Sequence, residues 1–371
     1  MGFKRIYILI LVIGIIIISI YFLNQNGVGK NLSQKVLNIS PRISSEEKSM
    51  RYELAKEITT PDGFINTADK SITISEFIGK KVILVDFWTY SCINCQRTTP
   101  YLNSWYEKYQ DDGLVIIGIH TPEFEFEKNY NNVKVAVEKF GIKFPVVLDN
   151  DYSTWIAYKN RYWPRKYLID IDGYIIYDHI GEGAYEETEM KIQEALQERM
   201  LVLNKGGNIE ESLTKDNSVR IGHSSPETYF GSDRNDLFIN GKSNITGKQN
   251  NLQIPSQINL NSLYLGGDWD IQEEFAENKS QDASIVYRYE AQSVFFVAKA
   301  DSEITIEVFI DGKPLGKEMG EDIVKTFDGK TILKIKEPRL YKIIQHNQSE
   351  GHILEMKIMN PGLQAFTFTF G

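Results

Sequence analysis

The sequence is poor in cysteine and histidine, and it has no long run of basic residues. It contains two cysteines and five histidines in 371 residues, and its formal net charge at pH 7 is -9. Two cysteines cannot build a framework of several disulfides, and an acidic chain without a basic stripe lacks the electrostatic signature of nucleic-acid binding. The histidines are scattered without a paired spacing, so the sequence predicts no metal site. We therefore expect no nucleic-acid partner and no cofactor beyond the two cysteines themselves.

The two cysteines, Cys92 and Cys95, lie only two residues apart. They follow an apolar run over residues 82–85 that is typical of a buried strand, and they open a helical pattern that includes Leu102 and Trp105. A helix N-terminus favours the thiolate, which is the reactive form of cysteine. We expect Cys92 to be the exposed nucleophile. Cys95, one turn inside on the same face, is then the resolving thiol that attacks a mixed disulfide.

Two structural interpretations of this pair compete with redox chemistry. A disulfide staple would contribute little, because the chain-entropy estimate for so small a ring is only about 2 kcal/mol, against about 3 kcal/mol for a fifteen-residue loop. Half of a zinc site would need a second pair of ligands at a suitable spacing, which the sequence does not supply. Redox chemistry is the favoured interpretation.

The longest apolar run lies near the start of the chain, over residues 6–23, directly after Lys4 and Arg5. About eighteen helical residues at 1.5 Å each cover roughly 27 Å, which is close to the thickness of a bilayer core. We predict an uncleaved signal-anchor helix over residues 1–23, with a cleaved signal peptide as the alternative. Because positive charge stays on the cytoplasmic side, the remaining chain is expected outside the cytoplasm, attached to the cell membrane by a single pass.

Two polar segments, residues 24–50 and 204–218, lack a sustained period and are typical of linkers. Between them, strand and helix patterns alternate, which predicts an α/β domain over residues 51–203 that starts with a small hairpin before the buried strand. Residues 219–371 alternate apolar and polar positions between turns, which predicts an all-β sandwich. The sequence thus predicts two domains behind the anchor.

Several residues around the cysteines fall at the offsets they have in thioredoxins: Asp86, Phe87, Trp88, Cys92, Cys95 and Pro100. The segment over residues 122–140 resembles the insertion of the TlpA-type exported thioredoxin-like reductases. Residues 87–95, 120–124 and 160–164 are similar to the DipZ family, and this resemblance runs from about Glu57 to the C-terminus. It implies a thioredoxin-like α/β domain followed by a β sandwich, a jelly roll similar to carbohydrate-binding modules.

Asp86 ends an apolar strand six residues before the first cysteine. Burial there would raise the pKa of a carboxyl group and make it a proton acceptor for Cys95, the proton relay that the thioredoxin resemblance also implies. The alternative is a strand-end carboxylate satisfied by water or by Lys80 or Lys81.

The resemblance also implies roles for residues farther along the chain. Pro164 is placed as the cis-proline of a loop that binds substrate and faces the dithiol, whereas an ordinary trans proline has the better general base rate. Glu123 is a candidate acid near the dithiol, with a solvated acidic loop as the alternative. Trp88, Tyr90 and Trp163 are candidate substrate contacts, although aromatic residues at such positions are more often core.

The β domain shows no catalytic constellation. In its last strand, Phe366, Phe368 and Phe370 are expected to share one face. The resemblance to carbohydrate-binding modules makes Trp269 and Tyr264 candidates for stacking on a sugar, with core packing as the alternative interpretation.

Together these features predict an extracytoplasmic thiol–disulfide oxidoreductase that reduces protein disulfides through a redox-active Cys92–Cys95 pair. Many DipZ proteins carry a multi-helix membrane domain that transfers electrons, and this sequence has one predicted helix, so a separate membrane electron donor of the CcdA type is expected. A glycan or cell-wall contact is expected through the β domain. The alternatives are a cell-envelope binding protein that acts mainly through the β domain and a thiol peroxidase. Residues 89–92 share the T-x-x-C core of peroxiredoxins, but Val85 stands where their motif has proline.

Overall fold

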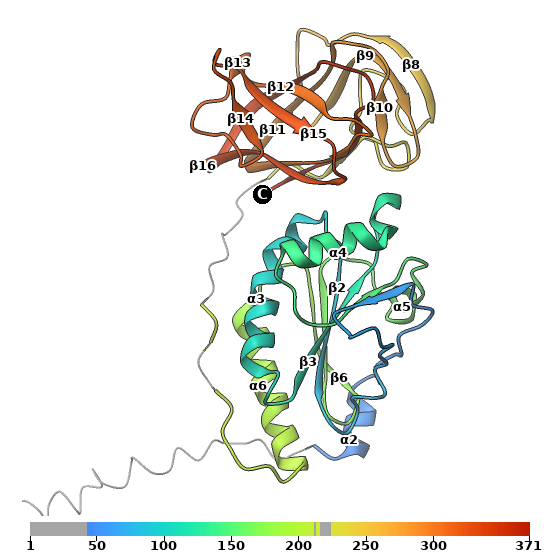
Figure 1. The fold of residues 1–371 in the computed structure, drawn as a ribbon, viewed down its shortest axis with the longest axis vertical. Coiled ribbons are helices and arrows are strands. Elements are labelled where there is room, and N and C mark those ends of the chain that lie inside the picture. Colours follow the sequence, from blue (N-terminus) through green and yellow to red (C-terminus); the bar gives the residue numbers. More distant parts are fainter. Residues whose placement is uncertain (1–42, 211–212, 216–223) are drawn as a thin grey trace, which may run out of the picture. The chain divides into compact units, whose positions relative to one another are not determined.

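The computed structural model describes residues 43–210, 213–215 and 224–371 (Figure 1). The predicted anchor over residues 1–23 lies outside the described residues. Among the described helices, none is both long and apolar enough to cross a membrane. Residues 51–371 belong to one compact unit, separate from the unit that precedes it. Within residues 51–371, we call the described residues up to 210 the α/β domain and residues 224–371 the β domain.

A six-stranded mixed sheet in the order β1-β4-β3-β2-β5-β6 forms the centre of the α/β domain. Its strands are β1 (Gly63–Ile65), β2 (Val82–Trp88), β3 (Leu114–His120), β4 (Val146–Leu148), β5 (Arg165–Ile169) and β6 (Ile175–Ile180). Strands β2, β3 and β4 are parallel, whereas β1, β5 and β6 run antiparallel to their neighbours. Every residue of β2 is buried, which explains why its sequence is almost continuously apolar rather than alternating.

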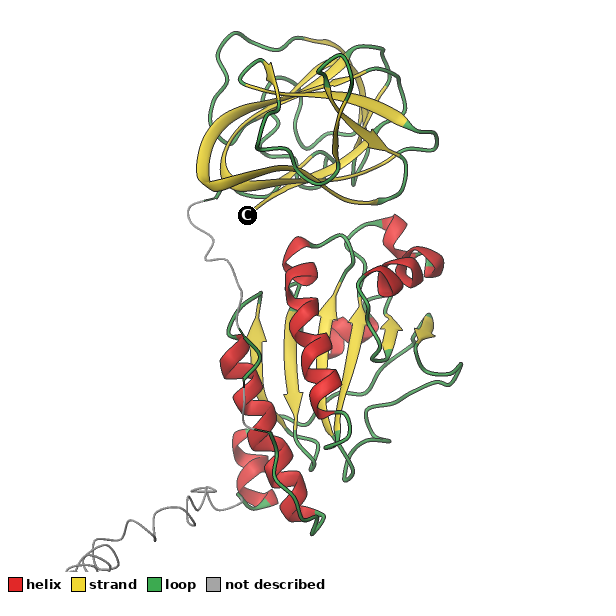
Figure 2. Ribbon diagram, turned by 60° about the vertical axis from the view of Figure 1, so that its left-hand side comes forward, coloured by secondary structure: helices red, strands yellow, loops and turns green. Residues whose placement is uncertain are grey.

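Helices cover both faces of this sheet (Figure 2). The helices of this domain are α3 (Ile93–Tyr109), η1 (Glu125–Lys128), α4 (Tyr130–Lys139), α5 (Ser153–Ala157) and α6 (Tyr185–Val202), and α2 (Ser45–Arg51) precedes the domain along the chain. On one face, Leu84 of β2 shares a hydrophobic cluster with Trp105 of α3 and Leu196 of α6. On the other face, Val85 of β2 clusters with Trp155 of α5. The side chain of Asp86, which alternates with Val85, therefore faces the side of α3.

The hairpin expected before the buried strand is absent from the described α/β domain, and that prediction was wrong. Strand β1 instead pairs antiparallel with β4, Gly63 opposite Leu148. The turn before β1 is held by the amide of Asp62, which donates to the carbonyl of Leu148 at 2.9 Å. Three residues are too few to specify a local partner, so a distant sheet edge determines the pairing.

The β domain is built on an eleven-stranded antiparallel sheet system. Its strands are β7 (Thr228–Tyr229), β8 (Gly247–Leu252), β9 (Leu263–Ile271), β10 (Ala276–Asn278), β11 (Ala283–Lys299), β12 (Ile304–Ile310), β13 (Lys313–Pro314), β14 (Ile323–Lys325), β15 (Thr331–Ile335), β16 (Arg339–Ile358) and β17 (Gln364–Phe370). The long strands β11 and β16 pair along most of their length. This agrees with the predicted β-rich second domain, and the finer description as a jelly roll stays a prediction.

A β-bulge in β17 changes which aromatic residues face the β core. Thr367 pairs with Val297, but Ala365 pairs with Ala298, so Phe366 is the extra residue. The alternation reverses at this point. Phe368 and Phe370 lie in the core of the β domain, whereas Phe366 belongs to the hydrophobic cluster of the α/β domain. The prediction that the three phenylalanines share one face was wrong for Phe366.

The two proposed sugar-stacking residues are buried in the β domain. Trp269 is 0% exposed and its indole N–H donates to the carbonyl of Gly266 at 2.9 Å. Tyr264 is 2% exposed and its hydroxyl accepts from the amide of Asn259 at 3.0 Å. Both are core residues, and neither presents a face to a ligand.

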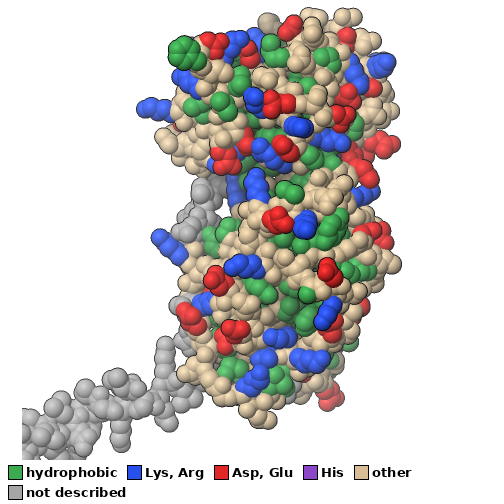
Figure 3. All heavy atoms as spheres, viewed as in Figure 1, with side chains coloured by type: hydrophobic (Ala, Val, Ile, Leu, Met, Phe, Trp, Pro, Cys, Tyr) green, Lys and Arg blue, Asp and Glu red, His purple; other side chains and the backbone are tan. Residues whose placement is uncertain are grey.

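On the surface, Figure 3 shows basic and acidic side chains interspersed over the visible face.

Candidate dithiol site

Strand β2 and helix α3 together position the two thiols. Cys92 is the N-cap of α3, and its Sγ accepts a hydrogen bond from the amide of Cys95 at 3.3 Å. The sulfur thus occupies the place where a helix offers unpaired N–H groups and the positive end of its dipole. Cys92 is partly exposed and Cys95 is 2% exposed, and both are free thiols. Solvent can therefore reach the sulfur of Cys92, whereas the sulfur of Cys95 is buried.

The loop before β5 reaches the accessible sulfur. The carbonyl oxygen of Trp163 lies 4.0 Å from Sγ of Cys92, and the bond between Trp163 and Pro164 is cis, as the resemblance implied. The Trp163 side chain is fixed, because its indole N–H donates to the carbonyl of Thr121 at 3.0 Å and its ring packs on Trp155 with centroids 4.3 Å apart. The loop therefore presents a fixed backbone edge beside Cys92. Its role in binding a substrate stays a prediction.

Asp86 is buried in the sheet behind the dithiol, 2% exposed, and its Oδ1 atom has no hydrogen-bond partner. It lies opposite Lys166 in the β2–β5 register. Burial raises the pKa of Asp86 to about 7, and the positive charge of Lys166 opposes this shift. Burial also raises the pKa of Cys95 well above its ordinary value, and the neighbouring Cys92 and Asp86 raise it further. The charge of Asp86 thus contributes to the raised pKa of the Cys95 thiol.

Lys166 was not found from the sequence, which offered Lys80 and Lys81 as partners of Asp86. Those two ammonium groups donate to the carbonyls of Glu76 and Gln110. Lys166 is 0% exposed, donates to the carbonyl of Gly181 at 3.2 Å, and has its pKa lowered by burial. A lysine at this point of a hairpin strand carries no sequence signal of burial, since only the strand register places it against Asp86.

A second buried carboxyl group, Glu127, holds the loop that carries the dithiol. It accepts hydrogen bonds from the amide and hydroxyl of Ser91, at 3.3 and 2.6 Å, and from the amides of Glu123 and Phe124, at 2.6 and 3.1 Å. Burial raises the pKa of Glu127 to about 7, and the hydrogen bond from Ser91 opposes that shift. The sequence shows only an acidic and aromatic loop, and it does not tell which of the glutamates points inward.

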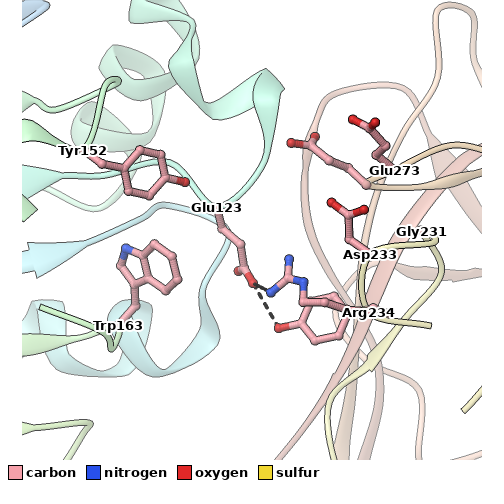
Figure 4. A pocket seen from close by; sticks show the side chains of 9 residues that line it. Glu123, Tyr152, Trp163, Gly231, Asp233, Arg234 and Glu273 are labelled. Atoms are coloured by element: carbon pink, nitrogen blue, oxygen red, sulfur yellow. Dashed lines mark hydrogen bonds and ion pairs between the residues drawn. The ribbon is translucent and has the colours of Figure 1, made fainter. Parts of the chain in front are cut away.

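Glu123 is the acid predicted near the dithiol, but its carboxylate makes its hydrogen bonds with the β domain (Figure 4). Its Oε1 atom lies 2.7 Å from Nη1 of Arg234 and accepts from the Tyr229 hydroxyl at 3.0 Å. The guanidinium group of Arg234 also stacks on the Tyr229 ring at 3.7 Å. Among the described carboxylates, the one bonded to the dithiol loop is Glu127 rather than Glu123.

The remaining predicted aromatic contacts are mostly enclosed. Trp88 is 3% exposed, and Tyr90 is 4% exposed and donates its hydroxyl to the carbonyl of Pro338 in the β domain at 3.2 Å. The Tyr90 ring stacks on His120, the last residue of β3, with centroids 5.7 Å apart. Burial lowers the pKa of His120 to about 3, so this histidine is neutral. Trp88 and Tyr90 belong to the same hydrophobic cluster as Cys95.

The β domain contacts several parts of this end of the α/β domain. Phe366 packs on Phe124 and Phe126, with ring centroids 5.1 and 4.8 Å apart. Arg97 of α3 lies over the Phe295 ring at 5.6 Å. A cavity of about 290 Å³ opens between the contacts, and Trp163 forms part of its wall (Figure 4). Its lining residues are Glu123, Tyr152, Trp163, Tyr229, Gly231, Asp233, Arg234, Glu273 and Glu274.

Comparison with known proteins gives one family match for each of the two domains. Residues 54–196 match the Redoxin family, and residues 225–371 match the family described as "Thioredoxin like C-terminal domain". The protein DipZ of Mycobacterium bovis and that of Mycobacterium tuberculosis are 33% identical to the chain over 350 residues. The chain is DipZ-like. The match covers 94% of this DipZ-like chain and 47% of each relative, so the chain spans about half the length of these curated relatives.

Two shorter relatives match less than two fifths of the chain. The thiol–disulfide oxidoreductase YkuV of Bacillus subtilis is 28% identical over 142 residues, which cover 38% of the DipZ-like chain and 93% of YkuV. The thiol–disulfide oxidoreductase ResA of Bacillus thuringiensis is 34% identical over 120 residues, which cover 32% of the chain and 66% of ResA. The family matches show that the chain combines a redoxin domain, which contains the Cys-x-x-Cys pair, with a second domain over residues 225–371.

Proposed function

We propose that this DipZ-like chain is a thiol–disulfide oxidoreductase that reduces disulfides of protein substrates outside the cytoplasm. The observation that supports it best is the partly exposed Cys92 sulfur at the start of α3, in front of the buried Cys95. Thiol–disulfide exchange needs one sulfur that a partner protein can reach and a second sulfur close enough to attack the first. In this proposal, residues 51–203 carry the chemistry and residues 219–371 form a domain beside it.

The reaction consists of two exchanges. The Cys92 thiolate attacks one sulfur of the substrate disulfide, which forms a mixed disulfide while the other substrate sulfur leaves as a thiolate and takes up a proton. Cys95 then loses its proton, attacks Sγ of Cys92, and releases the second substrate thiol. Asp86 accepts the Cys95 proton. Two electrons pass to the substrate, and the chain is left with a Cys92–Cys95 disulfide.

A dithiol donor must reduce this disulfide before the next cycle. We propose a separate membrane electron donor of the CcdA type, with the chain held at the membrane by its predicted N-terminal helix. Both ideas rest on the sequence of residues 1–23 and on the family resemblance. The equilibrium reduction potential of the pair tests the direction, because a value near -270 mV supports a reductase and one near -120 mV supports an oxidant.

Substitution of the cysteines tests the central proposal. Cys92→Ser should lower the rate of disulfide reduction by at least about 1,000-fold, because the nucleophile is lost. Cys95→Ala should instead accumulate mixed disulfides with substrate, which non-reducing gels and mass spectrometry would detect. A Cys92→Ser protein that reduces insulin disulfides at the native rate would refute the assignment.

Substitution of Asp86 tests the proton relay. Asp86→Asn should slow release of the mixed disulfide about 100-fold at pH 8, within the usual range for general-base catalysis. In the unaltered protein the rate should rise with pH through about 7, the pKa to which burial raises Asp86, and this rise should vanish in the variant. Asp178→Asn, an exposed carboxylate paired with Arg165, is the matched control. An unchanged pH profile in Asp86→Asn would exclude the relay.

A further inference from the structure

A wide bulge in β16 brings together two histidines of the β domain. Ala291 of β11 pairs with Glu350, but Ser293 pairs with Gln345, so residues 346–349 of β16 lie opposite the single residue between Ala291 and Ser293. Beside this bulge, the His346 and His352 rings stack with centroids 4.9 Å apart. Residues that a regular strand would separate thus become neighbours.

The side-chain atoms of these histidines converge on one carboxylate. Oε2 of Glu350 lies 3.2 Å from Nε2 of His352 and 3.8 Å from Nδ1 of His346. The three ligand atoms all lie within 4.8 Å of one another. A tetrahedral ion with bonds of about 2.0–2.1 Å holds its ligand atoms about 3.3 Å apart. The Glu350–His352 separation already fits this value, and the Glu350–His346 separation of 3.8 Å exceeds it by about 0.5 Å.

The outer nitrogen of each ring has its own partner. Nδ1 of His352 lies 2.7 Å from Oδ2 of Asp311, and Nε2 of His346 lies 2.8 Å from the Tyr289 hydroxyl. Asp311 is itself fixed, because its Oδ1 accepts from the amide of Ile353 at 2.9 Å. Metal-binding histidines are typically held in this way, with the outer N–H bonded to a carboxylate or another acceptor. Nε2 of His352 lies within hydrogen-bond distance of Oε2 of Glu350, at 3.2 Å, so an ion would have to replace the proton between these two atoms. With the remaining proton on the outer nitrogen, each inner nitrogen then has a lone pair for the ion.

We propose that His346, Glu350 and His352 bind a divalent transition-metal ion of the zinc class. Two imidazole nitrogens and one carboxylate oxygen suit zinc and its neighbours, whereas calcium and magnesium prefer oxygen ligands alone. The His346 side chain is 5% exposed, that of His352 24% and that of Glu350 40%, so the site opens to solvent on the Glu350 side. A water molecule or an external ligand can occupy the fourth position.

Metal titration of the full chain tests this proposal. Because the dithiol binds the same metals, the titration uses the full chain with Cys92→Ser and Cys95→Ser. Calorimetry with Zn²⁺ should show one saturable equivalent, and Co²⁺ should give the visible absorption of a four-coordinate nitrogen and oxygen site. Glu350→Gln and the double variant His346→Gln/His352→Gln should each weaken Zn²⁺ binding at least about 100-fold. Asp311→Asn, which keeps all three ligands, should weaken it about 10- to 100-fold.

Controls separate loss of the site from loss of the fold. Glu355→Gln, on the same strand and paired with Lys357, and His179→Gln, in the α/β domain, should bind Zn²⁺ like the parent. Zn²⁺ should raise the melting temperature of the parent and of both controls, but not that of the Glu350→Gln variant. The proposal is overturned if the parent shows no saturable binding. It is equally overturned if a variant without both histidines binds Zn²⁺ as tightly as the parent.

Discussion

The two domains differ in how they satisfy their buried polar groups. Among the described residues, the buried side-chain nitrogen and oxygen atoms without a hydrogen-bond partner belong to Thr67, Asp86, Trp88, Asn103, Trp105, His120 and Asn150 in the α/β domain, and to Ser224 and Gln364 in the β domain. In the β domain, by contrast, the buried amide of Asn278 bonds to the backbone of Ser280, Asn360 and Leu363. An unpaired buried polar group costs about 1–3 kcal/mol. Most of these unpaired atoms therefore lie in the α/β domain, Asp86 among them, and fewer lie in the described β domain.

The largest effect that follows from this difference is a pH dependence of stability set by Asp86. Its pKa is about 7 in the folded protein and 3.8 as the ordinary value. Between pH 3.8 and about pH 7, the Asp86 carboxyl group is protonated in the folded state and ionised in the unfolded state. The contribution of the protonated carboxyl group to the free energy of unfolding is therefore fully present below about pH 4. It is lost as pH rises through about 7. Relative to Asp86→Asn, the free energy of unfolding of the reduced protein should fall by up to about 4 kcal/mol, three pKa units at 1.36 kcal/mol each.

Denaturant titrations between pH 4 and pH 8 would measure this effect. Burial also lowers the pKa of His120 to about 3 and raises that of Glu127 to about 7. Both proteins contain these two residues, so their contributions to the pH dependence cancel in the difference between the two free energies of unfolding. Asp178→Asn serves as the exposed control. A wild-type minus Asp86→Asn difference that does not change with pH would show that Asp86 is not desolvated as described.

A somewhat smaller effect is expected where the two domains meet. Phe366→Ala should lower the free energy of unfolding by about 3 kcal/mol, the low end for a buried phenylalanine, because the surrounding contact can relax. It should also speed amide exchange in η1, whose Phe126 packs on Phe366. Phe368→Ala, its neighbour in the β core, should destabilise the β domain and leave exchange in η1 unchanged. Equal exchange in η1 for both variants would contradict the separate roles given to these two residues.

The smallest effect concerns the ion pair between Glu123 and Arg234. The Arg234 side chain is 42% exposed, so solvent screens the pair. A double-mutant cycle with Glu123→Gln and Arg234→Met should give a coupling energy of about 1 kcal/mol or less at low salt. This coupling should shrink in 1 M salt, whereas the effect of Phe366→Ala should not. A coupling that is insensitive to salt would mean that stacking on Tyr229, rather than charge, holds Arg234.

The elements next to the cysteines could be predicted from the sequence because their signals are local. A continuous apolar run predicts β2, and a helical period after Cys92 predicts α3. The thioredoxin-like domain, the β-rich second domain and the DipZ resemblance are confirmed. The anchor, the domain boundaries and the roles of the site residues stay predictions.

The features that the sequence does not reveal depend on distant pairing. Lys166 faces Asp86 only through the β2–β5 register, and Phe366 turns outward because one extra residue enters β17. His346 and His352 looked scattered because a bulge of four residues is invisible in the sequence pattern. Among similar glutamates, Glu127 is distinguished only by the short η1 turn that directs it inward. In each case the local pattern is compatible with several long-range partners.

Strand β17 also imposes an order on synthesis. It pairs with β11, β10 and β7, and it follows every other strand of the β domain along the chain. A growing polypeptide that has not yet reached residues 364–370 leaves the edges of these strands open, and open edges invite pairing with other chains. Phe366 of the same strand packs on the loop beside the dithiol. The nascent chain can therefore complete its α/β sheet early, whereas closure of the β domain and its contact with the dithiol end must wait for one late segment.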